Sequence, residues 1–276
     1  MFVTLIDFFI FSIIAYQSSF HVAMKIVLIG AGNLASSLAP ALKRAGHTIP
    51  QVYSRTLESA SLLAEKVGAQ PLCDFALIRS DADVYIYALR DEVYKLMPAF
   101  DCRPDAVHLL TSGSVPYTDL KESAHRGVMY PFQSFSKSKP QTDFSSVPVM
   151  IEGEDERAVS IIRILAESIS GKVYDSTPQS RVRLHLAGVL ANNFTNCMYA
   201  LAEEQLRDAG LPFDILLPLI DETAATVHFL SPREAQTGPA SRHDFEVMKR
   251  QLLLLPDEEQ RSIYTLVSEN IIKSRR

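Results

Sequence analysis

A glycine-rich string near residue 30 contains the residue types that a phosphate-binding turn requires. It directly follows the apolar run 25–29, opens a run with helical spacing, and consists of Gly30-Ala31-Gly32-Asn33-Leu34-Ala35. In such a turn the first glycine permits a tight bend, and the second lets a diphosphate approach the backbone. The N–H groups of Asn33 and Leu34 would then bind the anion at a helix N-terminus. The string alone is weak evidence, but its place between a strand and a helix makes it a specific signature of dinucleotide binding.

The end of the next β-branched run indicates which dinucleotide is bound. A site for NAD carries an acidic residue there, which accepts a hydrogen bond from the ribose 2′-hydroxyl. This chain has Ser54-Arg55-Thr56 instead. The Arg55 guanidinium can bind a 2′-phosphate, and the hydroxyls of Ser54 and Thr56 can donate to it. The sequence therefore predicts NADP, although a solvated Arg55 and a Thr56 that only caps a helix also fit the pattern.

Two further strand ends should face the same crevice, because ligands of open α/β sheets bind at the carboxyl ends of the strands. These ends are Ala88-Leu89-Arg90-Asp91 and Thr111-Ser112-Gly113-Ser114. We expect Leu89 and Arg90 to lie along the cofactor, and Asp91 to cap the next helix. Ser112 and Gly113 are expected beside the nicotinamide ring. The serines of this second end fit hydrogen bonding within the loop as well as they fit substrate contact.

Alternating strand and helix patterns would position these residues. Strands are predicted over 25–29, 49–53, 84–89, 107–110, 128–130, 147–151 and 172–174, with helices between the early ones. This alternation is typical of an α/β Rossmann domain whose mainly parallel, doubly wound sheet is covered on both faces. After residue 177 only helical patterns occur, over 181–209, 212–229, 245–254 and 257–272. We therefore predict a Rossmann domain over 24–176 and an all-α domain over 177–276.

Composition excludes several other classes of protein. The formal net charge is −5 and the basic residues form no stripe, so nucleic acid is not an expected partner. The three cysteines lie far apart, which argues against a disulfide framework and a metal site and favours a reducing compartment. The apolar run 8–15 is shorter than the roughly 20 residues that span a bilayer. We predict that Met24 is the native start and that 1–23 is a non-native or disordered extension; a signal or anchor segment is the alternative for these residues. We also predict that the protein is cytoplasmic and does not associate with membranes.

Several short motifs together resemble a known superfamily. GAGNLA, YSRT, ALRD, TSGS and YPFQSFS are similar to the N-terminal domain of the pyrroline-5-carboxylate reductase and 6-phosphogluconate dehydrogenase superfamily. HLAGVLANNFTN, AGLP and TGPASRHD resemble more specifically a branch of NADP oxidoreductases that joins this domain to a helical domain of unknown function. The resemblance covers nearly everything from Met24 onward. It implies an NADP-binding domain, a 6-phosphogluconate-dehydrogenase-like helical domain that commonly dimerises, and a substrate cleft between the two.

The chain departs from the hydroxyacid dehydrogenases of this superfamily at one important position. Their catalytic lysine stands three residues before a paired asparagine, where this chain has Val189 before Asn192-Asn193. Lysine-dependent alcohol oxidation is therefore not carried over. His185 lies seven residues before Asn192, so a continuous α-helix would place imidazole and amide on one face. His185 is a candidate general acid with Asn193 beside it, and a core histidine with a helix-bridging asparagine is the equal alternative.

A second catalytic candidate lies in the loop 237–244. It packs Arg242, His243 and Asp244 into consecutive positions after a Gly-Pro turn. Arg242 can bind a substrate carboxylate through two hydrogen bonds, and His243 can supply a proton. Asp244 is expected to cap the following helix, and a solvated loop is the alternative for the whole segment.

These observations predict an NADP(H)-dependent oxidoreductase that reduces an imine or carbonyl of a small metabolite. The missing lysine suits such a reduction better than it suits alcohol oxidation. A non-catalytic NADP-binding sensor is the alternative from another class, because no acid or base is unambiguous. Reduction of a deazaflavin, which uses the same N-terminal domain, is a third hypothesis. A homodimer formed through the helical domain is also expected.

Overall fold

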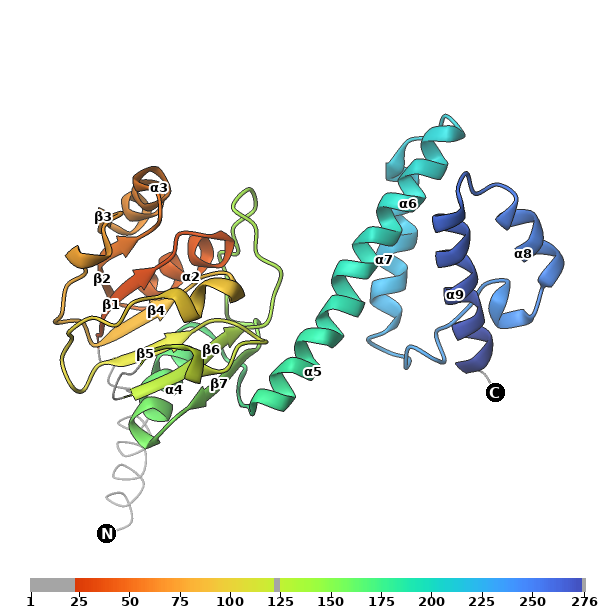
Figure 1. Cartoon of the computed structure of the whole chain (residues 1–276). Helices are drawn as coiled ribbons and strands as arrows, with labels where there is room; N and C mark the ends of the chain where they lie inside the picture. The colour runs from red at the N-terminus through yellow and green to blue at the C-terminus, as the bar shows by residue number, and fades with distance from the viewer. Residues whose placement is uncertain (1–22, 122–124, 275–276) are drawn as a thin grey trace, which may run out of the picture. The chain divides into compact units, whose positions relative to one another are not determined.

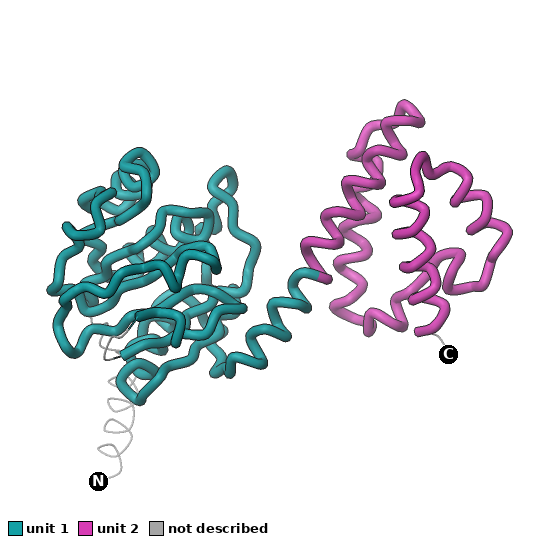
Figure 2. Tube along the Cα trace, viewed as in Figure 1, with its two compact units in different colours: residues 1–189 teal, residues 190–276 magenta. Residues whose placement is uncertain are grey.

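The computed structural model describes residues 23–121 and 125–274, so the predicted N-terminal extension lies, apart from Ala23, outside the described residues. The chain forms two compact units that divide after Val189 (Figure 2). The sequence placed the boundary between 176 and 177. The helix after Thr177 therefore belongs with the first unit, to which its buried Arg181 side chain ties it.

An eight-stranded sheet forms the centre of the first unit, in the order β3-β2-β1-β4-β5-β6-β7-β8 (Figure 1). All described pairings are parallel except that of β6 with β7. This confirms the predicted mainly parallel sheet and adds one strand, β3, that the sequence patterns missed. The strands are β1 (Lys25–Ile29), β2 (Thr48–Tyr53), β3 (Gln70–Leu72), β4 (Val84–Tyr87), β5 (Val107–Leu110), β6 (His125–Pro131), β7 (Val149–Gly153) and β8 (Val173–Asp175).

Three α-helices cover one face of this sheet, and these are α2 (Asn33–Arg44), α3 (Leu57–Val67) and α4 (Glu156–Ile169). Their apolar sides meet alternate residues of the strands, as Leu38, Leu63 and Leu165 share one buried cluster with Ile26 and Leu28. The alternation follows from the two-residue period of a strand, which sends Val27 and Ile29 to the opposite face. The sheet is therefore buried on both sides.

The second face is covered differently from the prediction. Helices were expected on both faces, but the described residues of the connections after β3, β4 and β5 contain only the short 3₁₀ helices η1 (Phe75–Leu77), η2 (Asp91–Leu96) and η3 (Tyr117–Asp119). Aromatic side chains fill the layer instead: Tyr94 is fully buried, and Phe100 packs edge-on against both Phe75 and Tyr85. Large rings thus bury the area that an α-helix would otherwise cover.

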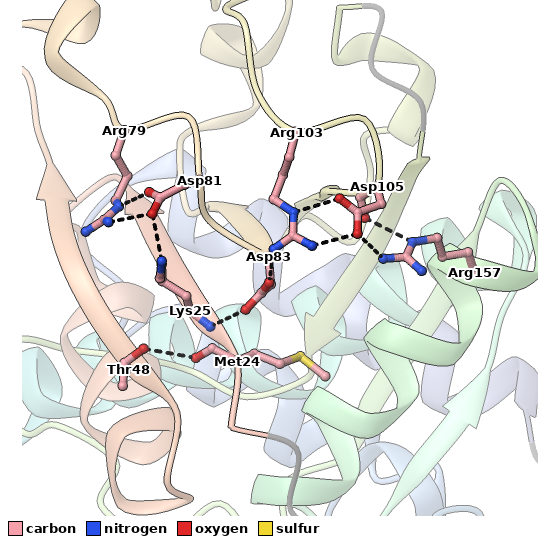
Figure 3. A network of polar contacts seen from close by, with 9 residues as sticks. All are labelled: Met24, Lys25, Thr48, Arg79, Asp81, Asp83, Arg103, Asp105 and Arg157. Atoms are coloured by element: carbon pink, nitrogen blue, oxygen red, sulfur yellow. Dashed lines mark hydrogen bonds and ion pairs between the residues drawn. The ribbon is translucent and has the colours of Figure 1, made fainter.

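A polar network lies at the amino ends of β1, β4 and β5, as Figure 3 shows. The backbone N–H of Lys25 donates to Asp83 at 2.7 Å, and its ammonium pairs with Asp81 at the same distance. Arg103 pairs with both Asp83 and Asp105, and its guanidinium holds the pKa of the Asp105 carboxyl below its usual range. Ligands of parallel sheets bind at the carboxyl ends of the strands. This network lies at the amino ends, so we assign it to stabilising the sheet and not to binding a ligand.

The connecting helix α5 (Pro178–Gly188) begins with a capping box formed by Thr177 and Ser180. One turn later the Arg181 side chain, 1% exposed, forms an ion pair with Glu152 of β7. Its guanidinium also donates to the Val115 carbonyl at 3.3 Å. Arg181 therefore fixes the first turn of α5 both to the sheet and to the loop that follows β5.

The described residues of the second unit form helices joined by loops, and no strand occurs among them. The predicted single helix over 181–209 is wrong, because the π-helical segment η4 (Val189–Phe194) separates α5 from α6. The further elements are α6 (Thr195–Asp208), the 3₁₀ helices η5 (Phe213–Leu216) and η6 (Ala240–Arg242), and α7 (Leu217–Thr226), α8 (Phe245–Leu252) and α9 (Glu258–Ser274). No helix among the described residues of the chain has the length and apolar character needed to cross a membrane.

Candidate functional site

The turn after β1 requires a glycine at position 30. Gly30 has φ +116°, a conformation that L side chains rarely adopt. A Cβ atom there would lie 2.2 Å from the carbonyl oxygen of Ala88, so the end of β4 passes directly beside the turn. The Gly30 N–H donates to the Tyr53 carbonyl at 2.8 Å. Gly30 therefore brings the carboxyl ends of β1, β2 and β4 together.

Gly32 fulfils a different requirement. Its φ of −82° is available to any residue, and a Cβ there would meet no protein atom within 4 Å. Packing of the protein thus gives no reason for the missing side chain, whereas close approach of a ligand to the backbone does. Gly32 is also the N-cap of α2, and neither a side-chain cap nor an acidic residue occupies the first turn. The first backbone N–H groups of α2 remain available to an anion.

The segment after β2 places its polar side chains at the same edge. Thr56 caps α3, as its hydroxyl accepts from the backbone N–H of Ser59 at 3.4 Å, which confirms the predicted cap. Arg55 is exposed, and no hydrogen bond or ion pair holds its guanidinium among the described residues. A cap and a phosphate ligand share this location, so the two interpretations of the segment hold together.

These strand ends line one pocket of about 400 Å³. Seven of the predicted cofactor residues line it: Gly30, Gly32, Ser54, Arg55, Thr56, Leu89 and Arg90. The remaining lining residues are Ala31, Tyr53, Ser59, Ala88, Val93, Met97 and Lys137. Three of the fourteen are cationic and none is acidic, although the whole chain carries a net charge of −5. Glu92 lies outside this lining and pairs with Arg90 at 3.4 Å. The pocket suits an anionic ligand.

Four predicted cofactor residues do not line the pocket. Asn33 and Leu34 belong to the first turn of α2, where only their backbone N–H groups were expected to bind, and the Leu34 side chain packs on the core. Ser112 and Gly113 are buried beyond the lining. The Ser112 hydroxyl accepts from the N–H groups of Ser114 and Val115, both at 3.1 Å. The structure therefore gives Ser112 the loop-stabilising role that was one of its two interpretations.

Asp91 corrects another expectation. It does not cap η2, because Arg90 stands at that cap position and no side chain fills the role. Asp91 instead accepts a hydrogen bond from the Ser114 hydroxyl, which ties the segment after β4 to the loop after β5. The carboxylate raises the pKa of Tyr130, although burial of the ring contributes more.

Tyr130 and His185 form a pair of polar side chains, of which only His185 was predicted as a site residue. The Tyr130 hydroxyl lies 3.1 Å from His185 Nδ1, so β6 and α5 each supply one partner. The Tyr130 ring covers Gly113, where a Cβ would come within 2.7 Å of it. His185 is exposed, so the predicted alternative of a core histidine is wrong. A phenol next to an exposed imidazole can hold a proton and exchange it with solvent.

The remaining catalytic candidates lie in the second unit. Asn193 is exposed within η4, and Asn192 Nδ2 lies 3.4 Å from its side-chain oxygen. The two-turn spacing inferred between His185 and the asparagines assumed an α-helix, and the π-helical turns remove that premise. Arg242 and His243 are exposed at the end of η6, and His243 adopts φ 58°. Asp244 accepts from the Val247 N–H at 3.1 Å, which confirms the predicted cap of α8.

Comparison with protein families assigns both parts of the chain. Residues 25–100 match the family described as NADP oxidoreductase, coenzyme F420-dependent. Residues 147–271 match a domain of unknown function, DUF2520. No curated protein matches the chain. The first stretch contains the motifs GAGNLA, YSRT and ALRD and the second contains HLAGVLANNFTN, AGLP and TGPASRHD, whereas TSGS and YPFQSFS lie between the two stretches.

Solved structures agree with this assignment. A protein from Bacteroides fragilis, named a “putative NADP oxidoreductase”, is 44% identical over 91% of this chain and 98% of its own, with a TM-score of 0.85. A protein from Thermotoga maritima is 23% identical over 90% of this chain and 98% of its own, with a TM-score of 0.72. The 1-pyrroline-5-carboxylate reductase of Streptococcus pyogenes is 16% identical over 91% and 97%, with a TM-score of 0.60. The last two share the fold, and so confirm the predicted α/β domain followed by a helical one.

Proposed function

The chain belongs to the NADP oxidoreductase family in which an F420-dependent-type N-terminal domain precedes DUF2520, and we propose that it uses NADPH to reduce a small imine or carbonyl compound. The pocket at the strand ends carries this proposal. It combines a turn that only glycine can form, a backbone open at Gly32 and a cationic lining without a carboxylate. Bound NADPH accounts for all three features. Its diphosphate approaches the backbone of the glycine turn closely, and its diphosphate and adenosine 2′-phosphate are anions that suit a cationic lining.

Arg55 supports NADPH over NADH. It lines the pocket beyond the end of β2, where the ribose of a bound dinucleotide lies in this fold. Its guanidinium has no competing carboxylate partner among the described residues, so charge-assisted hydrogen bonds to a 2′-phosphate would displace only water. The hydroxyl of Ser54 would add a donor on the same side.

When bound, the cofactor supplies a hydride from nicotinamide C4, and the protein contributes orientation and a proton. The proton would pass from the Tyr130 hydroxyl to the nitrogen or oxygen of the acceptor, and His185 would restore it from solvent. The Tyr130 phenol is protonated at neutral pH, and burial together with the Asp91 carboxylate raises its pKa further. Arg242, His243 and Asn193 of the helical unit are further candidates for substrate recognition, with Arg242 suited to a carboxylate.

A titration tests the cofactor assignment. NADPH and NADH are titrated into wild type, Arg55→Ala and Lys66→Ala, an exposed position of α3 outside the pocket. We expect wild type and Lys66→Ala to prefer NADPH, and the preference to shrink about tenfold in Arg55→Ala, the effect of losing one charge-assisted contact. Equal affinities of wild type for the two nucleotides would refute the assignment to NADP.

A turnover assay separates the enzyme from its alternatives. NADPH oxidation is followed with cyclic imines, 2-oxoacids and coenzyme F420 as acceptors, in wild type, Tyr130→Phe and His185→Gln. Turnover of an imine or oxoacid that both variants slow at least tenfold supports the proposal. Turnover of F420 alone would assign a deazaflavin reductase, and tight NADPH binding without any turnover would favour the non-catalytic sensor.

We further propose that the protein is a homodimer formed through the helical unit. Among the described residues of that unit only Ala240, Ser241 and Ser268 are buried, so its helices enclose no apolar core of their own. Exposed apolar side chains recur every four residues at Leu190, Phe194 and Met198, from η4 into α6. A helix that exposes such a row needs a partner surface, and a second copy of the chain is always available.

A further inference from the structure

Lys137 is the pocket residue that no sequence motif indicated. It belongs to the loop 132–148 between β6 and β7, far along the chain from the glycine-rich turn. Its side chain is exposed and lines the same pocket as Gly32 and Arg55. No described residue forms an ion pair with its ammonium group. The ammonium group can therefore bind an anionic ligand in the pocket without first breaking an ion pair within the protein.

The loop around Lys137 is held in place on both sides. Before it, the ring of Phe135 stacks on that of Phe144 at 5.7 Å, and Phe144 is buried in the core beneath α2 and α4. Next to it, the hydroxyls of Ser136 and Ser138 lie 2.7 Å apart and bracket the lysine in a local turn. Lys137 is therefore presented by a packed segment, which reduces the conformational entropy that binding would cost.

The contacts of this loop with α2 indicate from which side Lys137 enters the pocket. The backbone N–H of Gln141 donates to Ser37, one turn into α2, at 3.0 Å, and Arg44 donates to the Thr142 carbonyl farther along that helix. Followed back from Thr142 through Gln141 toward Lys137, the loop thus runs along α2 toward the N-terminus of that helix, and it is visible beside α2 in Figure 1. Arg55, by contrast, follows β2 and adjoins α3. The two cations enter the pocket from different elements.

We propose that Lys137 binds the diphosphate of the dinucleotide and thereby completes the site that the N-terminus of α2 begins. This inference rests on the proposed function. The amide groups of the helix provide donors and a partial positive charge, whereas the diphosphate carries two full negative charges. An ammonium group on a flexible stem suits such a ligand, since it binds as a point charge without a required geometry. Lys137 then contributes affinity for both dinucleotides, and Arg55 contributes the choice between them.

Calorimetric titration of the full chain tests this division of labour without any activity measurement. NADPH and NADH are each titrated into wild type, Lys137→Gln, Arg55→Ala and Lys139→Gln, the last an exposed lysine of the same loop outside the pocket. We expect Lys137→Gln to weaken both nucleotides by a similar factor of about five to ten, and Lys139→Gln to leave both unchanged. Arg55→Ala should weaken NADPH alone.

Other outcomes overturn the inference in distinguishable ways. A loss in Lys137→Gln confined to NADPH would place the lysine at the 2′-phosphate, and unchanged binding of both nucleotides would remove it from the site. In either case the proposed function stands as long as wild type prefers NADPH. If wild type bound neither nucleotide, the proposed function would fail and this inference with it. Lys137→Arg, which keeps the charge, should retain most of the affinity that Lys137→Gln loses.

Discussion

The two glycines of the turn after β1 have separate physical reasons, and substitution can tell them apart. Gly30→Ala should destabilise the protein by at least about 1–3 kcal/mol, because φ +116° is strained for alanine and its Cβ would press on the Ala88 carbonyl. Gly32→Ala should leave the unfolding temperature almost unchanged and yet weaken NADPH binding strongly, because its Cβ meets no protein atom. Thermal unfolding and nucleotide titration of both variants measure this. A large loss of stability in Gly32→Ala would contradict the assignment of this position to the ligand.

His108 and Cys102 resemble a nucleophile with its base, and burial argues against that role. The Cys102 sulfur lies 3.3 Å from His108 Nε2, and the Tyr87 hydroxyl lies 2.9 Å from Nδ1. Burial lowers the pKa of His108 to about 4 and raises the pKa of the Cys102 thiol. Both groups are therefore neutral near pH 7, and a neutral thiol is a poor nucleophile. The pair serves the aromatic layer of the second sheet face.

The lowered pKa of His108 makes a prediction about acid stability. An unfolded histidine has a pKa near 6.5, so the unfolded chain binds a proton that the folded chain refuses until about pH 4. Stability contributed by the neutral ring is therefore complete above pH 6.5 and is lost as the pH falls toward 4, by roughly 3 kcal/mol in total. Urea unfolding across this range should show a steep decline in wild type and a flatter one in His108→Gln, which cannot titrate. Equal slopes would contradict the assignment.

Residues of the candidate site were predictable from sequence when they adjoin a strand end. Gly30, Arg55 and Arg90 each follow a buried strand, and the carboxyl ends of parallel strands meet at one edge. Lys137 and Tyr130 were not predictable in this way. Lys137 reaches the pocket through the path of a loop, and that path depends on Phe144 and Ser37, contacts that no local pattern records.

At the scale of elements, strands and the first helices followed from periodicity, and two other features did not. The described residues of the connections across the second sheet face form no α-helix, because rings such as Tyr94 and Phe100 bury that face from short segments. Only the assembled sheet makes such packing favourable. The π-helical η4 was read as α-helix because six residues are too few to separate the two periods.

The junction between α5 and the sheet depends on one buried ion pair. Arg181→Met leaves the carboxylate of Glu152, whose side chain is 14% exposed, without its partner and should destabilise the first unit by about 3–5 kcal/mol. Combining it with Glu152→Leu should recover most of this loss, because an apolar pair of similar volume needs no compensating charge. The control Arg163→Met breaks the exposed pair with Asp175 and should cost less than about 1 kcal/mol. Urea unfolding of the four proteins measures the differences, and a double variant no more stable than Arg181→Met would contradict coupling.

At the scale of the whole molecule, the helical unit presents the strongest physical demand for a partner. Phe229 is 86% exposed and Leu253 is 78% exposed, values typical of an unfolded chain or of a surface awaiting a partner. Helices of this length are marginally stable by themselves, and tertiary burial normally supplies what they lack. Only three described residues of the helical unit are buried, so packing within the unit supplies little of this tertiary burial.

We therefore expect twice the mass of one chain in solution and a melting temperature that rises with protein concentration, because association and folding of the helical unit are linked. Leu190→Glu and Phe194→Glu place a charge in the row of exposed apolar side chains and should shift the mass toward one chain, while Arg250→Glu, an exposed polar position of α8, should not. Light scattering after gel filtration and thermal unfolding over a hundredfold range of concentration measure both quantities. A single-chain mass together with a constant melting temperature would contradict the dimer. The apolar surface would then have to be covered within one chain, which the packing of the helical unit alone does not provide.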